Sequence, residues 1–229
     1  MKKKESHAIE IPDGVRSEGR VLLHACCAPC SSAIVEWLLA HGVRPTIYYF
    51  NPNIFPREEY ETRKCESQRH AAALGLDWID DDWSHAQWLC GVRGLEGEAE
   101  RGGRCLRCFE LRLTATARKA RELGFGWFAT TLASSRWKRL DQIEAAGRAA
   151  EAAVAGDDGT ADSSLATAAD ASDSVTAGVA IDSMGLVRGP RFWAQNWRKG
   201  GLQERRNELL RQYDFYNQQY CGCEFSQRP

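Results

Sequence analysis

Apolar positions follow two kinds of spacing along this chain. Short runs rich in β-branched and aromatic residues predict buried strands, whereas apolar residues three or four positions apart predict helices with one buried face. Strands are expected at 21–25, 46–50, 78–79 and 127–132. Helices are expected at 29–41, 56–74, 106–123, 138–153 and 202–213. Because strands alternate with helices, the pattern predicts an α/β fold with a mainly parallel sheet and right-handed crossovers.

Two segments depart from this pattern. Residues 1–19 are polar and contain a Pro-Asp-Gly turn signal, so we expect a flexible leader outside the core. Residues 155–184 lack aromatic and basic side chains, and such a composition buries too little apolar surface to offset the entropy of ordering. The composition of 155–184 therefore predicts a disordered insertion. With a total length of 229 residues, we expect 20–229 to form a single domain.

Charge and hydropathy narrow the class of protein. No apolar run approaches the ~20 residues that cross a bilayer, and the lysine-rich start lacks the apolar region of a signal peptide. This predicts a cytoplasmic protein with no membrane partner. The net charge is −1, yet 101–148 carries 11 Lys/Arg against 4 Asp/Glu, and 188–211 carries 7 against 2. This segregation favours a positive face and a phosphate-rich partner.

Nine cysteines are the main chemical signal. An odd number in a reducing compartment excludes a secreted disulfide framework and favours metal or redox chemistry. Two of the nine, Cys65 and Cys90, stand alone and are expected to be small buried hydrophobic residues. The other seven form three clusters, which are Cys26, Cys27 and Cys30; Cys105 and Cys108; and Cys221 and Cys223.

The first cluster follows the first predicted strand. Ligands of open α/β sheets bind beyond the carboxyl ends of the strands, and the amino end of a helix favours thiolate over thiol. The spacing of Cys105 and Cys108 lets two sulfurs converge on one metal or cluster. Together with Cys26 and Cys27 they fit either zinc or a 4Fe-4S cluster. The vicinal pair favours the 4Fe-4S cluster, because its ligands arrive at different corners.

The third cluster has one intervening glycine. This spacing allows a small, strained disulfide of the labile, catalytic kind. The alternative is that Cys221 and Cys223 are additional ligands or part of an inert tail.

Other polar and aromatic positions have two interpretations each. Residues 51–54 follow the second strand at the same sheet edge and are either a simple turn or part of a site. Tyr60, Arg63 and Lys64 are expected on an exposed helix face.

A short stretch combines aromatic with basic side chains. Arg198 and Lys199 follow two tryptophans, Trp193 and Trp197, and this combination suits base stacking and phosphate contacts. Core packing of the tryptophans is the alternative.

Taken together, these motifs resemble the cobalamin-independent epoxyqueuosine reductase family, which performs the last step of queuosine modification in tRNA. The resemblance implies a Rossmann-like sheet akin to adenine nucleotide alpha hydrolases, with helices on both faces. The chain departs from the family pattern at Phe50, at Arg136 and in the acidic insertion, all in loops. The matching segments are LLHACCAPCS (22–31), the stretch 49–63, RCLRCFELRL (104–113), FATTLASS (128–135) and YCGC (220–223).

The resemblance also implies the cofactor, the substrate and the site residues. Expected are a 4Fe-4S cluster, a redox-active disulfide, reduction of epoxyqueuosine in the anticodon loop of tRNA, and an electron donor protein. Two assignments come from the residues themselves rather than from the resemblance. Cys30 is a candidate ligand of one additional iron, the alternative being that it only tunes the site, and Arg198 and Lys199 are candidate tRNA contacts. The implied metal ligands are Cys26, Cys27, Cys105 and Cys108, and the implied disulfide joins Cys221 to Cys223.

Two other functions compete with this one. A zinc-stabilised, non-catalytic tRNA-binding module would use the same thiols without electron transfer. A thiol-based sulfurtransferase of the same sheet class would need an ATP-binding loop of the SGGxDS type after the first strand. The stretch ACCAPCS occupies that place instead, which favours the reductase.

Overall fold

The computed structural model describes residues 8–81, 84–155 and 189–226. The expected insertion at 155–184 lies outside these ranges, apart from Ala155, which ends a helix.

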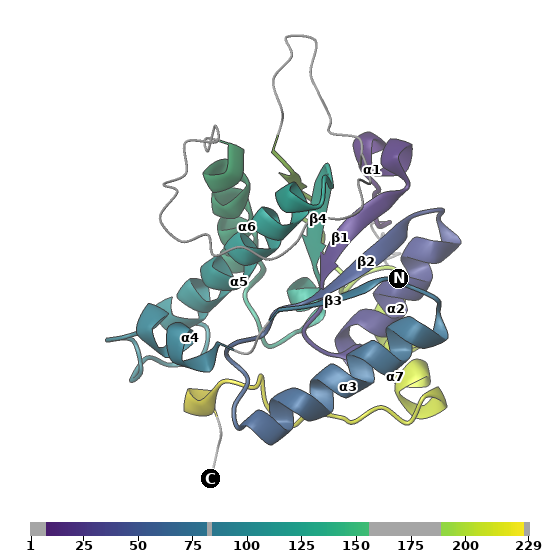
Figure 1. Ribbon diagram of the computed structural model, residues 1–229. Helices are drawn as coiled ribbons and strands as arrows, with labels where there is room; N and C mark the ends of the chain where they lie inside the picture. Colours follow the sequence, from purple (N-terminus) through teal and green to yellow (C-terminus); the bar gives the residue numbers. More distant parts are fainter. Residues whose placement is uncertain (1–7, 82–83, 156–188, 227–229) are drawn as a thin grey trace, which may run out of the picture.

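Five parallel strands form the central sheet (Figure 1). The chain begins at the central strand, builds outward on one side, and then returns to build outward on the other. The order is therefore β3-β2-β1-β4-β5, and the direction of winding reverses between β1 and β4. Such a reversal is where α/β sheets bind ligands. The strands are β1 (Arg20–His24), β2 (Arg44–Tyr49), β3 (Trp78–Asp80), β4 (Trp127–Thr130) and β5 (Arg191–Phe192).

Helices cover both faces of the sheet. Helices α2, α3 and α7 lie on one face, and α5 and α6 lie on the other (Figure 1). None of the helices in the described ranges is long and apolar enough to span a membrane. The helices are α1 (Asp13–Glu18), α2 (Ala28–Ala40), α3 (Arg57–Ala73), α4 (His85–Gly91), α5 (Gly103–Glu122), α6 (Leu140–Ala155) and α7 (Leu202–Gln212), with short 3-10 turns η1 (Thr131–Ser134) and η2 (Glu224–Ser226).

The core is built around β1, whose Val21, Leu22 and Leu23 are fully buried. A strand covered on both faces is continuously apolar, which is why this run predicted a buried strand. In α2, Ile34 and Leu38 lie four positions apart and form the buried face of the helix. The α/β class and the parallel sheet predicted from the sequence are confirmed.

Local elements differ from the predictions in three places. Helix α4 and strand β5 were not expected, because both are too short for a periodic pattern. The predicted strand at 127–132 ends at Thr130, and η1 follows it. The Thr130 hydroxyl accepts a hydrogen bond of 3.2 Å from the Leu132 N–H, which turns the chain out of the sheet.

The expected leader is partly ordered against the core. Helix α1 lies within it, and Val15 is fully buried while Ile11 is 7% exposed. Ile11 lies just before the helix and Val15 lies in it, and both belong to the hydrophobic core. Only residues 1–7 of the expected leader lie outside the described ranges.

If α1 belongs to the core, Val15→Ala should lower the free energy of unfolding by about 1.5–3 kcal/mol, because it removes two buried methyl groups and leaves a small cavity. Urea unfolding measures this change. Arg16→Ala, one residue further along and exposed, is the matched control and should change stability by less than about 0.5 kcal/mol. Equal stability of the two variants would contradict the packing of α1.

Candidate functional site

Three thiols gather where β1 ends. The Sγ atoms of Cys26, Cys27 and Cys30 all lie within 4.8 Å of one another, with 3.9 Å between the first two. The backbone bends at Cys26, and Cys27, which has extended backbone, directly precedes the first residue of α2. Among the described residues, no other group of three His, Cys, Asp or Glu side chains converges in this way.

The three thiols share protons. Hydrogen bonds from Cys27 and then Cys30 lower the pKa of Cys26 well below its usual value. Burial raises the pKa of Cys27, and the hydrogen bond to Cys26 raises the pKa of Cys30 to about 11. The Gln218 side-chain N–H also donates to the Cys27 sulfur at 2.9 Å. The group therefore favours a single thiolate on Cys26, and a metal ion would replace the remaining protons.

A buried histidine fixes the geometry beneath these thiols. His24 Nδ1 lies 2.8 Å from the Thr130 hydroxyl, and its Nε2 lies 3.1 Å from the Phe50 carbonyl oxygen. Burial, followed by the charge of Arg112, lowers the pKa of His24 to about 3, so the ring is neutral. Because the carbonyl only accepts, Nε2–H donates to it and Nδ1 accepts from the hydroxyl. His24 thus joins the carboxyl ends of β1 and β4 to the loop after β2.

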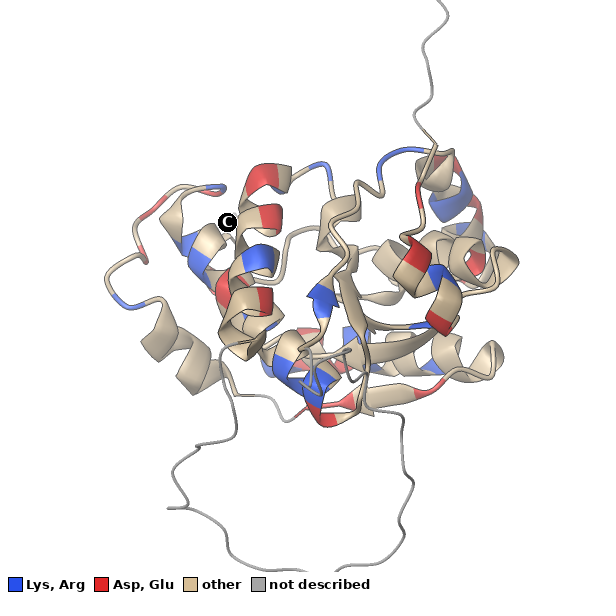
Figure 2. Cartoon of the chain, turned by 90° about the horizontal axis from the view of Figure 1, so that it is seen from above, with Lys and Arg blue, Asp and Glu red and all other residues tan. Residues whose placement is uncertain are grey.

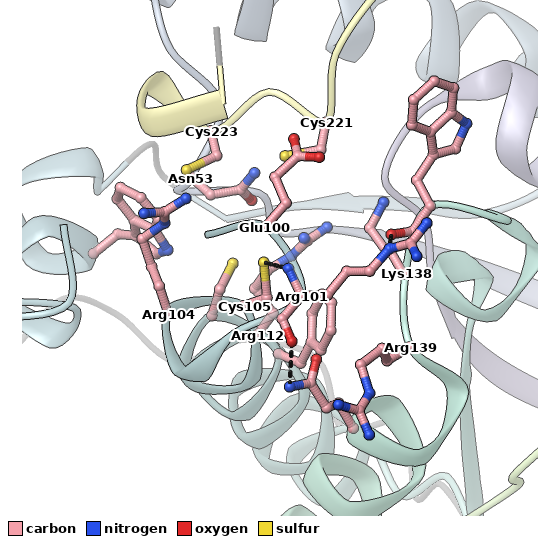
Figure 3. A pocket seen from close by; sticks show the side chains of 15 residues that line it. Asn53, Glu100, Arg101, Arg104, Cys105, Arg112, Lys138, Arg139, Cys221 and Cys223 are labelled. Carbon is pink, nitrogen blue, oxygen red and sulfur yellow. Dashed lines mark hydrogen bonds between the residues drawn. The ribbon is translucent and has the colours of Figure 1, made fainter. Parts of the chain in front are cut away.

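The second and third cysteine clusters meet in a pocket. Cys105 and Cys108, in the first turns of α5, line it together with Cys221 and Cys223 (Figure 3). The Arg101 backbone N–H donates to the Cys105 sulfur at 3.2 Å. Within the proposed four-cysteine set, Cys105 and Cys108 thus line a pocket with the C-terminal pair, whereas Cys26 and Cys27 group with Cys30.

An amide connects the two groups of thiols. Asn51 Nδ2 donates to the Ala25 carbonyl oxygen at 3.0 Å, and Asn51 Oδ1 accepts from the Arg112 guanidinium. Arg112 belongs to α5, which also carries the second cysteine cluster, and Ala25 precedes Cys26. Residues 51–54 are thus part of the site rather than a simple turn.

The C-terminal thiols are held by an arginine that the sequence placed on an exposed face. Arg63 is only 2% exposed, and its guanidinium donates to the carbonyl oxygens of Tyr220 at 3.1 Å and Cys221 at 3.3 Å. Glu59 balances its charge at 2.6 Å. The prediction of an exposed face at Tyr60 and Arg63 is wrong, because both side chains are buried. Arg63 turns inward to the C-terminal segment, whereas Tyr60 packs against the ring of Tyr49.

Glycine is required between the C-terminal thiols. Gly222 has a φ of 97°, and a Cβ there would lie 2.8 Å from Ile54 and 3.0 Å from Arg63. Its carbonyl oxygen accepts from the Phe55 N–H at 2.9 Å, so the turn lies against the loop after β2.

The two C-terminal thiols differ in acidity. The hydrogen bond from Cys223 lowers the pKa of Cys221 well below its usual value, and the same bond raises the pKa of Cys223. Both are free thiols in the structure. A thiolate beside a thiol is the starting arrangement for reversible disulfide formation.

Positive charge is concentrated at the pocket. Basic and acidic positions are interspersed along the helices in Figure 2, so in that view the positive face expected from the sequence does not stand out. Five cationic side chains but only one carboxylate, that of Glu100, line the pocket (Figure 3). The cationic residues are Arg101, Arg104, Arg112, Lys138 and Arg139.

The aromatic and basic stretch at 193–199 has mostly a structural role. Trp193 and Trp197 are 3% and 0% exposed, so the core interpretation of these tryptophans holds. Arg198 is half-buried, and its guanidinium donates to the carbonyl oxygens of Ser135 and, at 2.6 Å, Lys138. Arg198 therefore binds its own chain, and only Lys199 of the candidate tRNA contacts keeps a partly exposed side chain without such bonds.

The two isolated cysteines are exposed, which contradicts their expected burial. Cys65 lies on the solvent side of α3 and Cys90 on that of α4. Neither lines the pocket, so both serve as controls for the clustered thiols.

Sequence reasoning missed three residues that shape the site: His24, Gln218 and Lys138. A histidine that ends an otherwise apolar strand is a signal that was available at position 24. Gln218 carries no comparable signal, because it reaches the first cluster only after the chain has folded back from α7.

The fold and the site together define a class of protein. A parallel α/β sheet that gathers buried thiols at its winding reversal is the architecture of a metal- or thiol-dependent enzyme of the Rossmann-like type. A family model described as "Epoxyqueuosine reductase QueH" matches residues 21–158 and 165–229.

Curated proteins with that description are similar over nearly the whole chain. The relative from Haemophilus influenzae is 37% identical over 96% of this chain and 75% of its own length. The relatives from Histophilus somni and Acinetobacter baylyi are 37% and 34% identical, again over 96% of this chain. The matched regions cover 76% and 84% of these two proteins. The chain belongs to the epoxyqueuosine reductase QueH family, and it is an oxidoreductase.

If Arg63 anchors the C-terminal thiols, Arg63→Ala should increase the rate at which Cys221 and Cys223 react with a thiol reagent, because two backbone carbonyls lose their donors. Mass spectrometry of labelled peptides measures the rate at each cysteine. Arg57→Ala, on the same helix but 66% exposed at its side chain, should leave both rates unchanged. Unchanged rates in Arg63→Ala would show that other contacts hold the segment.

Proposed function

We propose that this chain reduces epoxyqueuosine to queuosine at the wobble position of tRNA, with a 4Fe-4S cluster and a thiol pair that cycles through a disulfide. The observation that carries the proposal is the pocket in which Cys105 and Cys108 face Cys221 and Cys223. The thiols that we propose as cluster ligands and those that we propose to exchange line the same space. Membership in a family of reductases favours this function over a non-catalytic zinc module that would use the same residues.

The donor set suits a soft metal centre. Its thiols are buried or half-buried, no carboxylate belongs to the group at Cys26, and thiolates select iron-sulfur clusters or zinc over harder cations. Cys26, Cys27, Cys105 and Cys108 would hold a 4Fe-4S cluster, and Cys30 is a candidate ligand of one additional iron. When bound, such a centre supplies electron transfer and a Lewis-acidic iron.

The thiol pair can supply the electrons and protons that one turnover consumes. Removing the epoxide oxygen as water breaks two C–O bonds, forms one C=C bond, and consumes two electrons and two protons. Oxidation of the Cys221 and Cys223 thiols to one disulfide supplies two electrons and two protons. An electron donor protein would then reduce the disulfide for the next cycle.

Lys138 links the two groups of thiols electrostatically. After the hydrogen bonds from neighbouring thiols, its positive charge contributes to lowering the pKa of both Cys26 and Cys221. Lys138 comes from the loop after η1, at the carboxyl end of β4, and its side chain extends into the pocket (Figure 3). An ammonium there stabilises thiolates in both groups and attracts a phosphate-bearing substrate.

Anaerobically purified protein should contain about four irons with matching acid-labile sulfide per chain. Replacing any of Cys26, Cys27, Cys105 or Cys108 by Ala should abolish the visible absorbance of the cluster and all turnover, because three thiolates hold such a cluster poorly. Cys65→Ala and Cys90→Ala, at exposed positions, are the controls and should retain both. One zinc per chain and no sulfide would overturn the cluster assignment.

The thiol pair is tested by a single turnover without external reductant. Protein with reduced thiols, mixed with RNA that carries epoxyqueuosine, should form about one queuosine per chain and lose two titratable thiols. Cys221→Ser and Cys223→Ser should keep the cluster absorbance but form no queuosine under these conditions, whereas Cys90→Ser should behave as the parent. Product formation without loss of thiols would contradict the disulfide step.

A further inference from the structure

An exposed tryptophan stands at the mouth of the pocket. Trp137 is 56% exposed, and its residue lines the same pocket as the four facing cysteines. Within the described ranges, Tyr216 is the only other large hydrophobic residue with an exposed side chain. Its hydroxyl donates a hydrogen bond of 2.8 Å to the Glu59 carboxylate. The Trp137 indole is therefore an unusual feature: a large aromatic surface that faces solvent beside a reactive site.

The loop that carries this tryptophan is held by two arginines. The Arg101 side chain donates to the Trp137 carbonyl oxygen at 2.9 Å, and Arg198 donates to the carbonyl oxygens of Ser135 and Lys138. Trp137 also donates its backbone N–H to the Ser135 hydroxyl at 3.3 Å. These bonds use backbone atoms of residues 135–138 and the Ser135 hydroxyl, and none of them uses the Trp137 indole, so the ring is not needed to form the loop.

The surroundings of the indole are cationic. The Arg136 guanidinium lies 5.5 Å from the centre of the ring, and Lys138 and Arg139 follow in sequence. An exposed aromatic ring among basic side chains matches a nucleic-acid strand, in which flat bases alternate with phosphates. An apolar protein partner would not require this charge, and a core-packing role does not fit the exposure.

We propose that the Trp137 indole is a stacking platform for an unpaired RNA base next to the nucleoside that enters the pocket. This inference rests on the proposed function, because it assigns a contact to the same substrate. The two arginine clamps hold the loop in place before the RNA arrives, which reduces the entropy lost on binding. Arg198 then contributes to RNA binding indirectly, as a positioning residue, rather than through a phosphate.

The test uses a stem-loop RNA with epoxyqueuosine in its loop. Trp137→Ala should weaken the affinity of the protein for this RNA by about 5- to 150-fold, the range that corresponds to about 1–3 kcal/mol per stacked base. Trp137→Phe keeps a smaller ring, so its affinity for the RNA should lie between those of Trp137→Ala and the parent protein. His41→Ala removes an exposed ring between the end of α2 and the start of β2, at the amino ends of the strands, and should not change the affinity. Iron content and cluster absorbance should be the same in all of these proteins.

A second measurement identifies the stacked base. Stem-loops in which the base on either side of the modified nucleoside is removed should bind the parent protein more weakly at one of the two positions. The same abasic RNA should bind Trp137→Ala with no additional loss, because the stacking partner is already gone. Additive losses at both positions would overturn the platform.

The outcomes separate this inference from the function on which it rests. Parent protein that fails to convert the modified RNA would refute the proposed function. Parent protein that converts it, together with Trp137→Ala of unchanged affinity, would refute the platform and leave the function standing. Unchanged RNA affinity with slower reduction by an electron donor protein would also refute it, since the indole would then contact that donor.

Discussion

The neutral, buried ring of His24 is the contact on which the geometry of the site depends. It accepts a hydrogen bond from Thr130 and donates one to the Phe50 carbonyl oxygen, so the ends of β1 and β4 and the loop after β2 have a fixed spacing. A protonated ring would lack the acceptor that Thr130 needs. Burial prevents that charge, and the residues that follow β1 turn into the thiol cluster from a rigid base.

Guanidinium groups hold the irregular segments of the site through hydrogen bonds to backbone carbonyl oxygens. Arg63 binds the segment that carries Cys221, Arg104 binds the loop at 95–98, and Arg198 binds the loop after η1. One guanidinium has five donors in a fixed plane, so a single side chain can fix two or three carbonyls of an irregular loop. Irregular segments fixed in this way border the pocket together with helix α5.

The candidate metal ligands and the C-terminal thiols rest on supports of different rigidity. Cys26, Cys27 and Cys30 are continuous with the central strand and its following helix, and Cys105 and Cys108 lie in the first turns of a long helix. Cys221 and Cys223 lie on an irregular segment held by hydrogen bonds from Arg63 and the loop after β2. Metal ligation benefits from the rigid supports, and thiol exchange from a segment with fewer core contacts.

The sequence by itself determined the α/β class, most strand and helix positions, and the three cysteine clusters, because buried strands, helix periodicity and vicinal thiols are local patterns. Only the tertiary structure decided that Cys105 and Cys108 face Cys221 and Cys223, that Arg63 is buried, and that Arg198 binds its own backbone. These outcomes depend on contacts between segments more than 60 residues apart, as in the Arg198–Ser135 bond across 63 positions. Local periodicity carries no information about such pairs, since the winding of the sheet brings them together.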